Sequence, residues 1–227
     1  MKESHQGEVP SNVASYAAIP PFDFCISILG SGGVGKTALL RSFFDQPFEE
    51  KHIPTVDDYY VHSLSMDGKH FTLCIVDTAG SYSFPVMRSL ALNSSHAYIV
   101  VYAVDDVVSF EEAVKTMEEI SALRGNSENV VPVILVGNKL DTDVTEREVT
   151  AREGYEAVSV LSRLEGEYIE ASAKIDFRVD KIFSNMLEAL IYKGRKRRRK
   201  KFAKRRLRVG LGKKQKFKEP HRTCNIM

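Results

Sequence analysis

Eight residues near the start of the chain combine glycines, a lysine and a hydroxyl in a spacing that suits phosphate binding. Residues 30–37 read GSGGVGKT, which matches the pattern G-x-x-x-x-G-K-[ST]. Glycines let backbone N–H groups turn toward phosphate oxygens, and a helix that begins there adds its positive end. Lys36 supplies a mobile charge and Thr37 a hydroxyl for Mg²⁺. The segment predicts a phosphate-binding loop; a glycine-rich turn without a ligand is the alternative.

A phosphate-binding loop also needs an acid near the metal ion and an unobstructed N–H group for the terminal phosphate. A later segment supplies an acid and a glycine. Asp77 ends an apolar run, and the sequence DTAG places Gly80 three residues later. Asp77 is expected near the metal, at the end of a neighbouring strand. The N–H group of Gly80 can approach a terminal phosphate because no side chain obstructs it.

Two short motifs indicate which base is bound. Residues 138–141 read NKLD after an apolar run, and residues 172–174 read SAK. Guanine presents two adjacent donors, N1–H and N2–H₂, which the carboxylate of Asp141 can accept together, whereas adenine lacks both. The Ala173 N–H is expected at the guanine carbonyl, with Lys139 packed over the base. These motifs favour GTP over ATP.

Alternating strands and helices are predicted to position these residues. Short apolar runs that stop at Gly or Asp suit strands buried on both faces of a parallel sheet, and apolar residues three and four apart suit helices between them. The alternation predicts a layered α/β domain. The expected strands are 22–29, 71–77, 97–104 and 131–137, and the expected helices are 36–44, 109–123, 146–164 and 179–193.

One pair of segments breaks this alternation. Residues 59–65 and 70–77 flank the sequence MDGK at 66–69. An Asp-Gly pair between two such runs is a hairpin signal. One edge strand is therefore expected to run antiparallel to its neighbour.

Charge divides the chain unevenly. Its 227 residues suit one domain with tails, and the formal net charge is +2. Residues 193–218 hold 16 Lys and Arg and no Asp or Glu, whereas residues 1–192 carry a net charge of −14. We expect a flexible arm at 1–20, a domain at 21–193 and a polybasic tail at 194–227.

Apolar runs and cysteines bear on the location of the protein. No apolar run is long enough to cross a bilayer as a helix. Cys25 and Cys74 lie inside apolar runs, which indicates small core residues rather than a disulfide framework. A reducing, cytosol-facing location is therefore expected.

With the loop, the acid, NKLD and SAK in this order, the chain resembles a Ras-family small GTPase over about residues 22–193. The resemblance implies a mostly parallel six-stranded sheet with one antiparallel edge strand and helices on both faces. It also implies a nucleotide-dependent switch whose two mobile segments close on the terminal phosphate. The predicted nucleotide-binding residues are Gly30, Ser31, Gly32, Gly33, Val34, Gly35, Lys36, Thr37, Ala38, Phe48, Thr55, Asp77, Gly80, Asn138, Lys139, Asp141, Ser172, Ala173 and Lys174.

The resemblance also assigns roles to single residues. Phe48 is placed against the edge of guanine, and residues 52–60 form the effector-binding segment. Mg²⁺ is expected on Thr37 and Thr55 directly and on Asp77 through water. The catalytic residues predicted in this way are Lys36, Thr55, Gly80 and Ser81.

Ser81 departs from the family pattern. Ras-like proteins usually carry glutamine after DTAG, where it orients the attacking water, and a serine hydroxyl does not reach as far. The segment SYSFPVMRSL resembles the Di-Ras, Rhes and dexamethasone-induced Ras-like branch, which also lacks this glutamine. We expect GTP binding with slow hydrolysis. The alternatives are that Tyr82 or another residue of the second switch replaces the glutamine, and that the chain is a constitutively GTP-bound docking module.

The last residues suggest a membrane anchor. CNIM at 224–227 fits C-a-a-X with a terminal Met, a pattern for farnesylation of Cys224. A lipid chain and a polybasic run together anchor a protein to anionic lipids at the cytoplasmic face of the plasma membrane. The rival interpretation of residues 195–208 is a nuclear or nucleolar address, or attachment to nucleic acid. The sequence names no exchange factor or activating protein.

Overall fold

The computed structural model describes most of the first of two units of the chain. The units are Met1–Leu190 and Ile191–Met227, and the described residues, apart from Ile191, belong to the first. The described residues are 21–50, 58–66, 68–78, 80, 85–124, 130–161 and 164–191.

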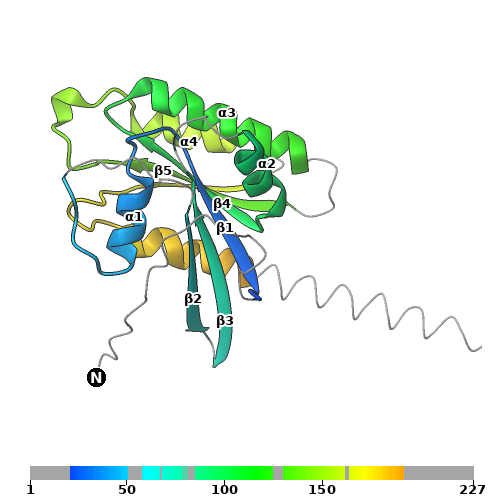
Figure 1. Cartoon of the computed structure of the whole chain (residues 1–227). Coiled ribbons are helices and arrows are strands. Elements are labelled where there is room, and N and C mark those ends of the chain that lie inside the picture. Colours follow the sequence, from blue (N-terminus) through cyan, green and yellow to red (C-terminus); the bar gives the residue numbers. More distant parts are fainter. Residues whose placement is uncertain are drawn as a thin grey trace, which may run out of the picture. The chain divides into compact units, whose positions relative to one another are not determined.

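These residues form a six-stranded sheet with the order β2-β3-β1-β4-β5-β6 (Figure 1). Neighbouring strands are parallel except for β2 and β3, which pair as an antiparallel hairpin. The elements in chain order are β1 Phe24–Leu29, α1 Lys36–Phe43, β2 Asp58–Met66, β3 Lys69–Asp77, α2 Pro85–Ser94, β4 Ala97–Ala103, α3 Val107–Arg124, β5 Val131–Asn138, the 3-10 turn Val144–Glu146, α4 Ala151–Ser159 and β6 Leu164–Glu170, followed by helical residues 179–191.

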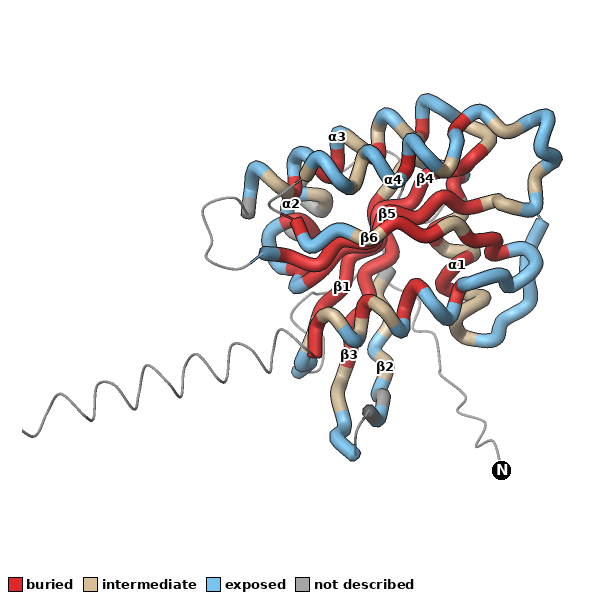
Figure 2. Tube along the Cα trace, turned by 180° about the vertical axis from the view of Figure 1, so that it is seen from behind, coloured by how far each residue is buried: buried red, intermediate tan, exposed pale blue. Residues whose placement is uncertain are grey.

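Helices cover both faces of the sheet. On one face, Leu39 and Leu40 of α1 and Phe183 of the last helix pack with alternate residues of the strands. On the other face, α2 and α3 pack against the remaining strand residues through Leu92 and Met117. Figure 2 shows the result, with buried strands at the centre and exposed residues on the outer sides of the helices. The expected α/β architecture and the antiparallel edge strand are confirmed.

The four expected parallel strands match β1, β3, β4 and β5 to within two residues at each end. Every residue of β4 and β5 is buried, as expected for strands covered on both faces. Cys25 and Cys74 lie opposite each other on β1 and β3 and are both buried. A hydrogen bond with Cys25, together with burial, raises the pKa of Cys74. Both cysteines are therefore small core residues, as the sequence predicted.

The helix expected at 146–164 is shorter than predicted. It begins after Thr150, whose hydroxyl accepts the Glu153 N–H while the Glu153 carboxylate accepts the Thr150 N–H. This capping box fixes the first turn and lowers the pKa of Glu153. The helix ends at Ser159, and Leu164 already belongs to β6. The prediction also lacked α2, whose ten residues begin at Pro85.

Among the described residues, no helix is both long enough and apolar enough to span a bilayer.

Candidate functional site

The candidate site lies at one edge of the sheet. Because β1, β3, β4, β5 and β6 are parallel, their carboxyl ends share that edge, where α/β proteins commonly bind ligands. Each strand leads directly into a residue of interest at this edge: Gly30 after β1, Asp77 at the end of β3, Asp105 just after β4, Asn138 at the end of β5 and Ser172 after β6. Motifs far apart in the sequence are therefore brought together.

The loop between β1 and α1 needs glycine at two crowded positions. Gly30 has φ +140°, and a Cβ there would lie 2.1 Å from the Val101 carbonyl oxygen. Gly35 has φ +95°, and a Cβ there would lie 2.2 Å from the Asn138 amide nitrogen. Both values of φ lie in the region that favours glycine. The loop can fold against β4 and Asn138 only because these side chains are absent.

Lys36 is held inside this loop. Its Nζ donates to the carbonyl oxygens of Gly30 and Ser31, at 2.8 Å each, and the residue is 5% exposed. A buried ammonium group surrounded by backbone dipoles is a strong anchor for an anion.

Thr37 and Asp77 form the oxygen-rich part of the site. The Thr37 hydroxyl donates to Asp77 Oδ2 at 2.6 Å, and Asp77 is buried at the end of β3. The next residue, Thr78, donates its hydroxyl to the Ile28 carbonyl at 2.7 Å, which fixes this strand end beside β1. A hydroxyl and a carboxylate are hard oxygen donors of the kind that Mg²⁺ prefers. The residues present fit this ion.

Gly80 lies against the phosphate-binding loop. A Cβ on Gly80 would come within 2.4 Å of both the Cα and the backbone nitrogen of Gly32. The loop therefore leaves no room for a side chain at position 80. This contact places the start of the predicted second switch beside the loop.

Asn138 links three loops. Its Nδ2 donates to the Val34 carbonyl at 2.8 Å, and its Oδ1 accepts the Ala173 N–H at 3.1 Å. The side chain is buried, so both bonds are shielded from water. One amide thus joins the GSGGVGKT loop to the NKLD and SAK segments.

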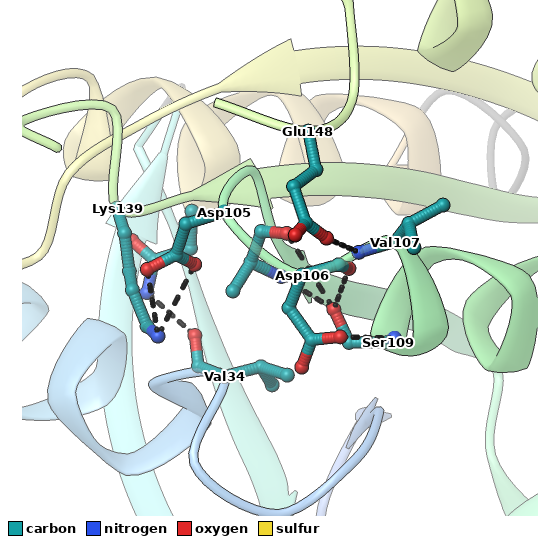
Figure 3. Close-up of polar contacts among 9 residues, drawn as sticks. Val34, Asp105, Asp106, Val107, Ser109, Lys139 and Glu148 are labelled. Atoms are coloured by element: carbon teal, nitrogen blue, oxygen red, sulfur yellow. Dashed lines mark hydrogen bonds and ion pairs between the residues drawn. The ribbon is translucent and has the colours of Figure 1, made fainter. Parts of the chain in front are cut away.

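The side chain of Lys139, the residue after Asn138, points toward an acid. Lys139 has φ +65°, and its Nζ lies 3.3 and 3.4 Å from the two carboxylate oxygens of Asp105. Figure 3 shows the lysine side chain pointing at Asp105. The aliphatic part of Lys139 is thereby held at the sheet edge.

The start of α3 is fixed beside this ion pair. The Ser109 N–H donates to Asp106 Oδ1 at 3.0 Å, and the Glu148 carboxylate accepts the Val107 N–H at 2.8 Å (Figure 3). These bonds satisfy backbone donors of the first helical turn, which have no partner within the helix. The segment that carries Asp105 is therefore held at both ends, by β4 and by α3.

The two base motifs also contact each other through Ser172 and Asp141. Ser172 is buried and donates its hydroxyl to Asp141 Oδ1, which orients that carboxylate. Lys174 is exposed, and Ala38 is half-buried against the core. Phe48 is 40% exposed, so its ring is available to an external ligand.

A buried tyrosine pair supports the strand that carries Asn138. The hydroxyls of Tyr102 and Tyr168 lie 2.8 Å apart, and a Cβ on Gly137 would meet both. Burial raises the pKa of Tyr102 to about 12, although the hydrogen bond with Tyr168 opposes the shift. Both phenols stay neutral at physiological pH and fix the end of β5.

Comparison with protein families gives the assignment. The model of the family described as the Ras family matches residues 26–192, most of the chain. The chain belongs to the Ras family. This placement agrees with the loop, the acid and the two base motifs at one sheet edge.

Named relatives of this Ras-family chain lie in the expected branch. "GTP-binding protein Di-Ras1" of Homo sapiens is 38% identical over 165 residues, which cover 73% of this chain and 80% of the relative. "GTP-binding protein Di-Ras2" of Mus musculus is 37% identical with the same coverage. "GTP-binding protein drn-1" of Caenorhabditis elegans is 35% identical over 166 residues, which cover 73% of this chain and 74% of the relative. The Di-Ras resemblance is confirmed.

Several predicted residues of this Ras-family chain lie outside the described residues. They are Thr55, Ser81, Tyr82 and Cys224. Of the predicted effector segment 52–60, only Asp58, Tyr59 and Tyr60 are described, as the first residues of β2.

Two acids at the site of this Ras-family chain were not predicted. Asp105 holds Lys139, and Glu112 of α3 accepts the hydroxyl of Ser31. A signal existed for Asp105, because it follows an apolar strand that ends at the same edge as Asp77. No such signal marks Glu112 in the sequence, because an acid inside a charged helix is usually a solvated residue.

Proposed function

We propose that this Ras-like small GTPase is a GTP/GDP-dependent signalling switch with slow intrinsic GTP hydrolysis. The observation that carries the proposal is the Asn138 bridge, which joins the phosphate-binding loop to both base motifs. In this proposal residues 30–38 surround the phosphates, while Phe48, Lys139, Asp141 and residues 172–174 surround guanine. The relatives named as GTP-binding proteins support the choice of nucleotide.

Mg²⁺ belongs to the proposed site. Thr37 and Thr55 would hold it directly, and Asp77 would hold it through water. The bonded pair of Thr37 and Asp77 supports this assignment, because it supplies hard oxygen donors beside the loop. When bound, the ion neutralises charge on the phosphate oxygens.

For catalysis, the proposal assigns positions to four residues. Lys36 stabilises charge on the phosphates, Thr55 and Gly80 close on the terminal phosphate, and Ser81 stands where a water-orienting glutamine is usual. Phosphoryl transfer depends on positioning and charge stabilisation more than on covalent help. A short hydroxyl at 81 leaves the attacking water without its orienting group, so hydrolysis is slow. Residues 52–60 contact effectors in this proposal.

Replacing Ser81 by glutamine is expected to speed single-turnover GTP hydrolysis by about 100-fold, a change of about 2.7 kcal/mol in the barrier. Ser81→Ala should stay near the parent rate, since the serine contributes little. The measurement is phosphate release from preloaded, purified protein at saturating Mg²⁺. A fast parent rate that Ser81→Gln leaves unchanged would contradict slow hydrolysis.

The alternative is a docking module that stays GTP-bound and does not cycle. The same serine favours it, because very slow hydrolysis leaves the GTP state populated. Nucleotide extracted from freshly purified protein separates the two cases. Mostly GTP supports the docking module, and mostly GDP supports a cycling switch.

We further propose that the domain at 21–193 is flanked by an arm at 1–20 and by a tail at 194–227 that anchors it to the plasma membrane. A farnesyl group on Cys224 and the basic run would act together on anionic lipids at the cytoplasmic face. Cys224→Ser should move a tagged protein from the membrane fraction to the soluble fraction. The matched control is Thr223→Ser, which changes the neighbouring residue and leaves the cysteine in place.

The basic run has a rival role as a nuclear address or nucleic-acid contact. In that case Cys224→Ser leaves the distribution unchanged, and neutralising residues 195–201 abolishes nuclear accumulation. Such a result would contradict the membrane anchor.

A further inference from the structure

Ser31 in the phosphate-binding loop is contacted from three directions. Its hydroxyl donates to the Glu112 carboxylate of α3, and its carbonyl accepts Lys36 Nζ at 2.8 Å. A Cβ on Gly80 would lie 2.6 Å from its carbonyl carbon. Ser31 thus lies between helix α3, the lysine of the loop and the start of the predicted second switch.

The acceptor, Glu112, belongs to a face of α3 that is held in place. Thr116 lies one turn further along the helix and donates its hydroxyl to the Glu112 carbonyl at 2.9 Å. Arg88 of α2 donates to Thr116 Oγ1 at 3.2 Å and to Glu119 at 2.7 Å. This face of α3 therefore contacts α2 on one side and the phosphate-binding loop on the other. Figure 1 shows α2 and α3 as neighbouring helices.

Helix α3 is also fixed at its beginning. Ser109 donates its hydroxyl to the Asp106 carbonyl at 2.7 Å, and the Ser109 N–H donates to Asp106 Oδ1 at 3.0 Å. Ala113 and Met117, on the side of the helix that faces the sheet, are buried in the core. The Glu112 carboxylate therefore projects from a rigid support.

We propose that Glu112 is a positioning residue for the nucleotide: through the Ser31 hydroxyl it holds the phosphate-binding loop in the shape that grips phosphate. The inference rests on the proposed nucleotide-binding function of that loop. A hydrogen bond to a carboxylate is stronger than a neutral one and has a defined direction. It fixes the Ser31 peptide, whose carbonyl in turn orients Lys36.

Loss of this bond is expected to act on nucleotide release. Ser31→Ala and Glu112→Ala should each speed release of a fluorescent GDP analogue by roughly three- to tenfold, the equivalent of one hydrogen bond. The two changes remove the same interaction, so the double variant should release nucleotide no faster than either single variant. Glu112→Gln keeps an acceptor oxygen and should fall between the parent and Glu112→Ala.

The experiment uses the full chain, loaded with the analogue and chased with excess GDP in a stopped-flow instrument. Glu111→Ala and Glu118→Ala are matched controls, because both are exposed acids of the same helix. Arg88→Ala loosens the contact between α2 and α3 without touching the loop. Glu111→Ala and Glu118→Ala should release nucleotide at the parent rate, and Arg88→Ala should speed release less than Glu112→Ala does, because it removes only an indirect support of Glu112.

Three results would overturn the inference. Release at the parent rate in Glu112→Ala, additive effects in the double variant, or an equal effect of Arg88→Ala would each mean that Glu112 does not position the loop. Failure of the proposed function is visible separately, because the parent protein would then take up no labelled GDP.

Discussion

Replacing Asn138 by alanine is expected to weaken GDP and GTP binding by about 100-fold or more. The change removes the partners of the Val34 carbonyl and the Ala173 N–H, both bonded to one buried amide. A buried polar group left unpaired costs about 1–3 kcal/mol, so two cost about 2–6 kcal/mol. A factor of 100 requires about 2.7 kcal/mol, which lies within that range.

Titration calorimetry with GDP and Mg²⁺ measures this loss directly. Asn138→Asp sharpens the test, because a carboxylate keeps the acceptor for Ala173 but presents an oxygen to the Val34 carbonyl, and it should bind as poorly as the alanine variant. Asn93→Ala is the control, since Asn93 is exposed and its amide donates to Ser89 of the same helix, α2. Affinity within threefold of the parent in Asn138→Ala would contradict the bridging role.

Gly30→Ala is expected to lower the free energy of unfolding by about 3 kcal/mol or more. The new Cβ would lie 2.1 Å from the Val101 carbonyl oxygen, and a backbone atom cannot move aside as a flexible side chain does. The φ of +140° adds conformational strain for any residue with a Cβ. Relief requires β1 and β4 to separate, and these strands lie at the centre of the sheet. A loss of this size is a large fraction of the usual stability of about 5–15 kcal/mol.

Urea unfolding followed by circular dichroism gives the difference between the parent and Gly30→Ala. Gly32→Ala is the matched control within the same loop, because a Cβ there would have no atom of the described residues within 4 Å. It should unfold within about 0.5 kcal/mol of the parent. Equal stability of Gly30→Ala and the parent would show that the loop and β4 can separate freely.

The central strands could be predicted because burial on both faces leaves a plain signal. In β4 and β5 all residues are buried, so the sequence shows continuous apolar runs. The edge strand β6 was missed, and its first residue was absorbed into a predicted helix, since charged residues such as Glu165 interrupt its apolar ones. The capping box at Thr150 and Glu153 was a readable start signal for α4 that apolar spacing alone did not reveal.

The candidate site was predictable where a motif has fixed spacing. Glycine, lysine and hydroxyl positions in one loop depend only on local geometry, so their sequence pattern is distinctive. Contacts between distant segments leave no such pattern. Ser31 and Glu112 are 81 positions apart, and Lys139 and Asp105 are 34 apart. Only the fold brings these pairs together.

The Asn138 bridge also bears on how the protein is made. Val34 is synthesised early, and the Asn138 side chain bonds both Val34 and Ala173. The bridge is complete only after Ala173 has been synthesised, and Ala173 follows the last strand of the sheet. At about 5–20 residues per second, translation from one to the other takes on the order of ten seconds. During that interval the bridge between the phosphate-binding loop and the SAK segment cannot form. We therefore expect guanine nucleotide to assist folding only in the final stage of synthesis.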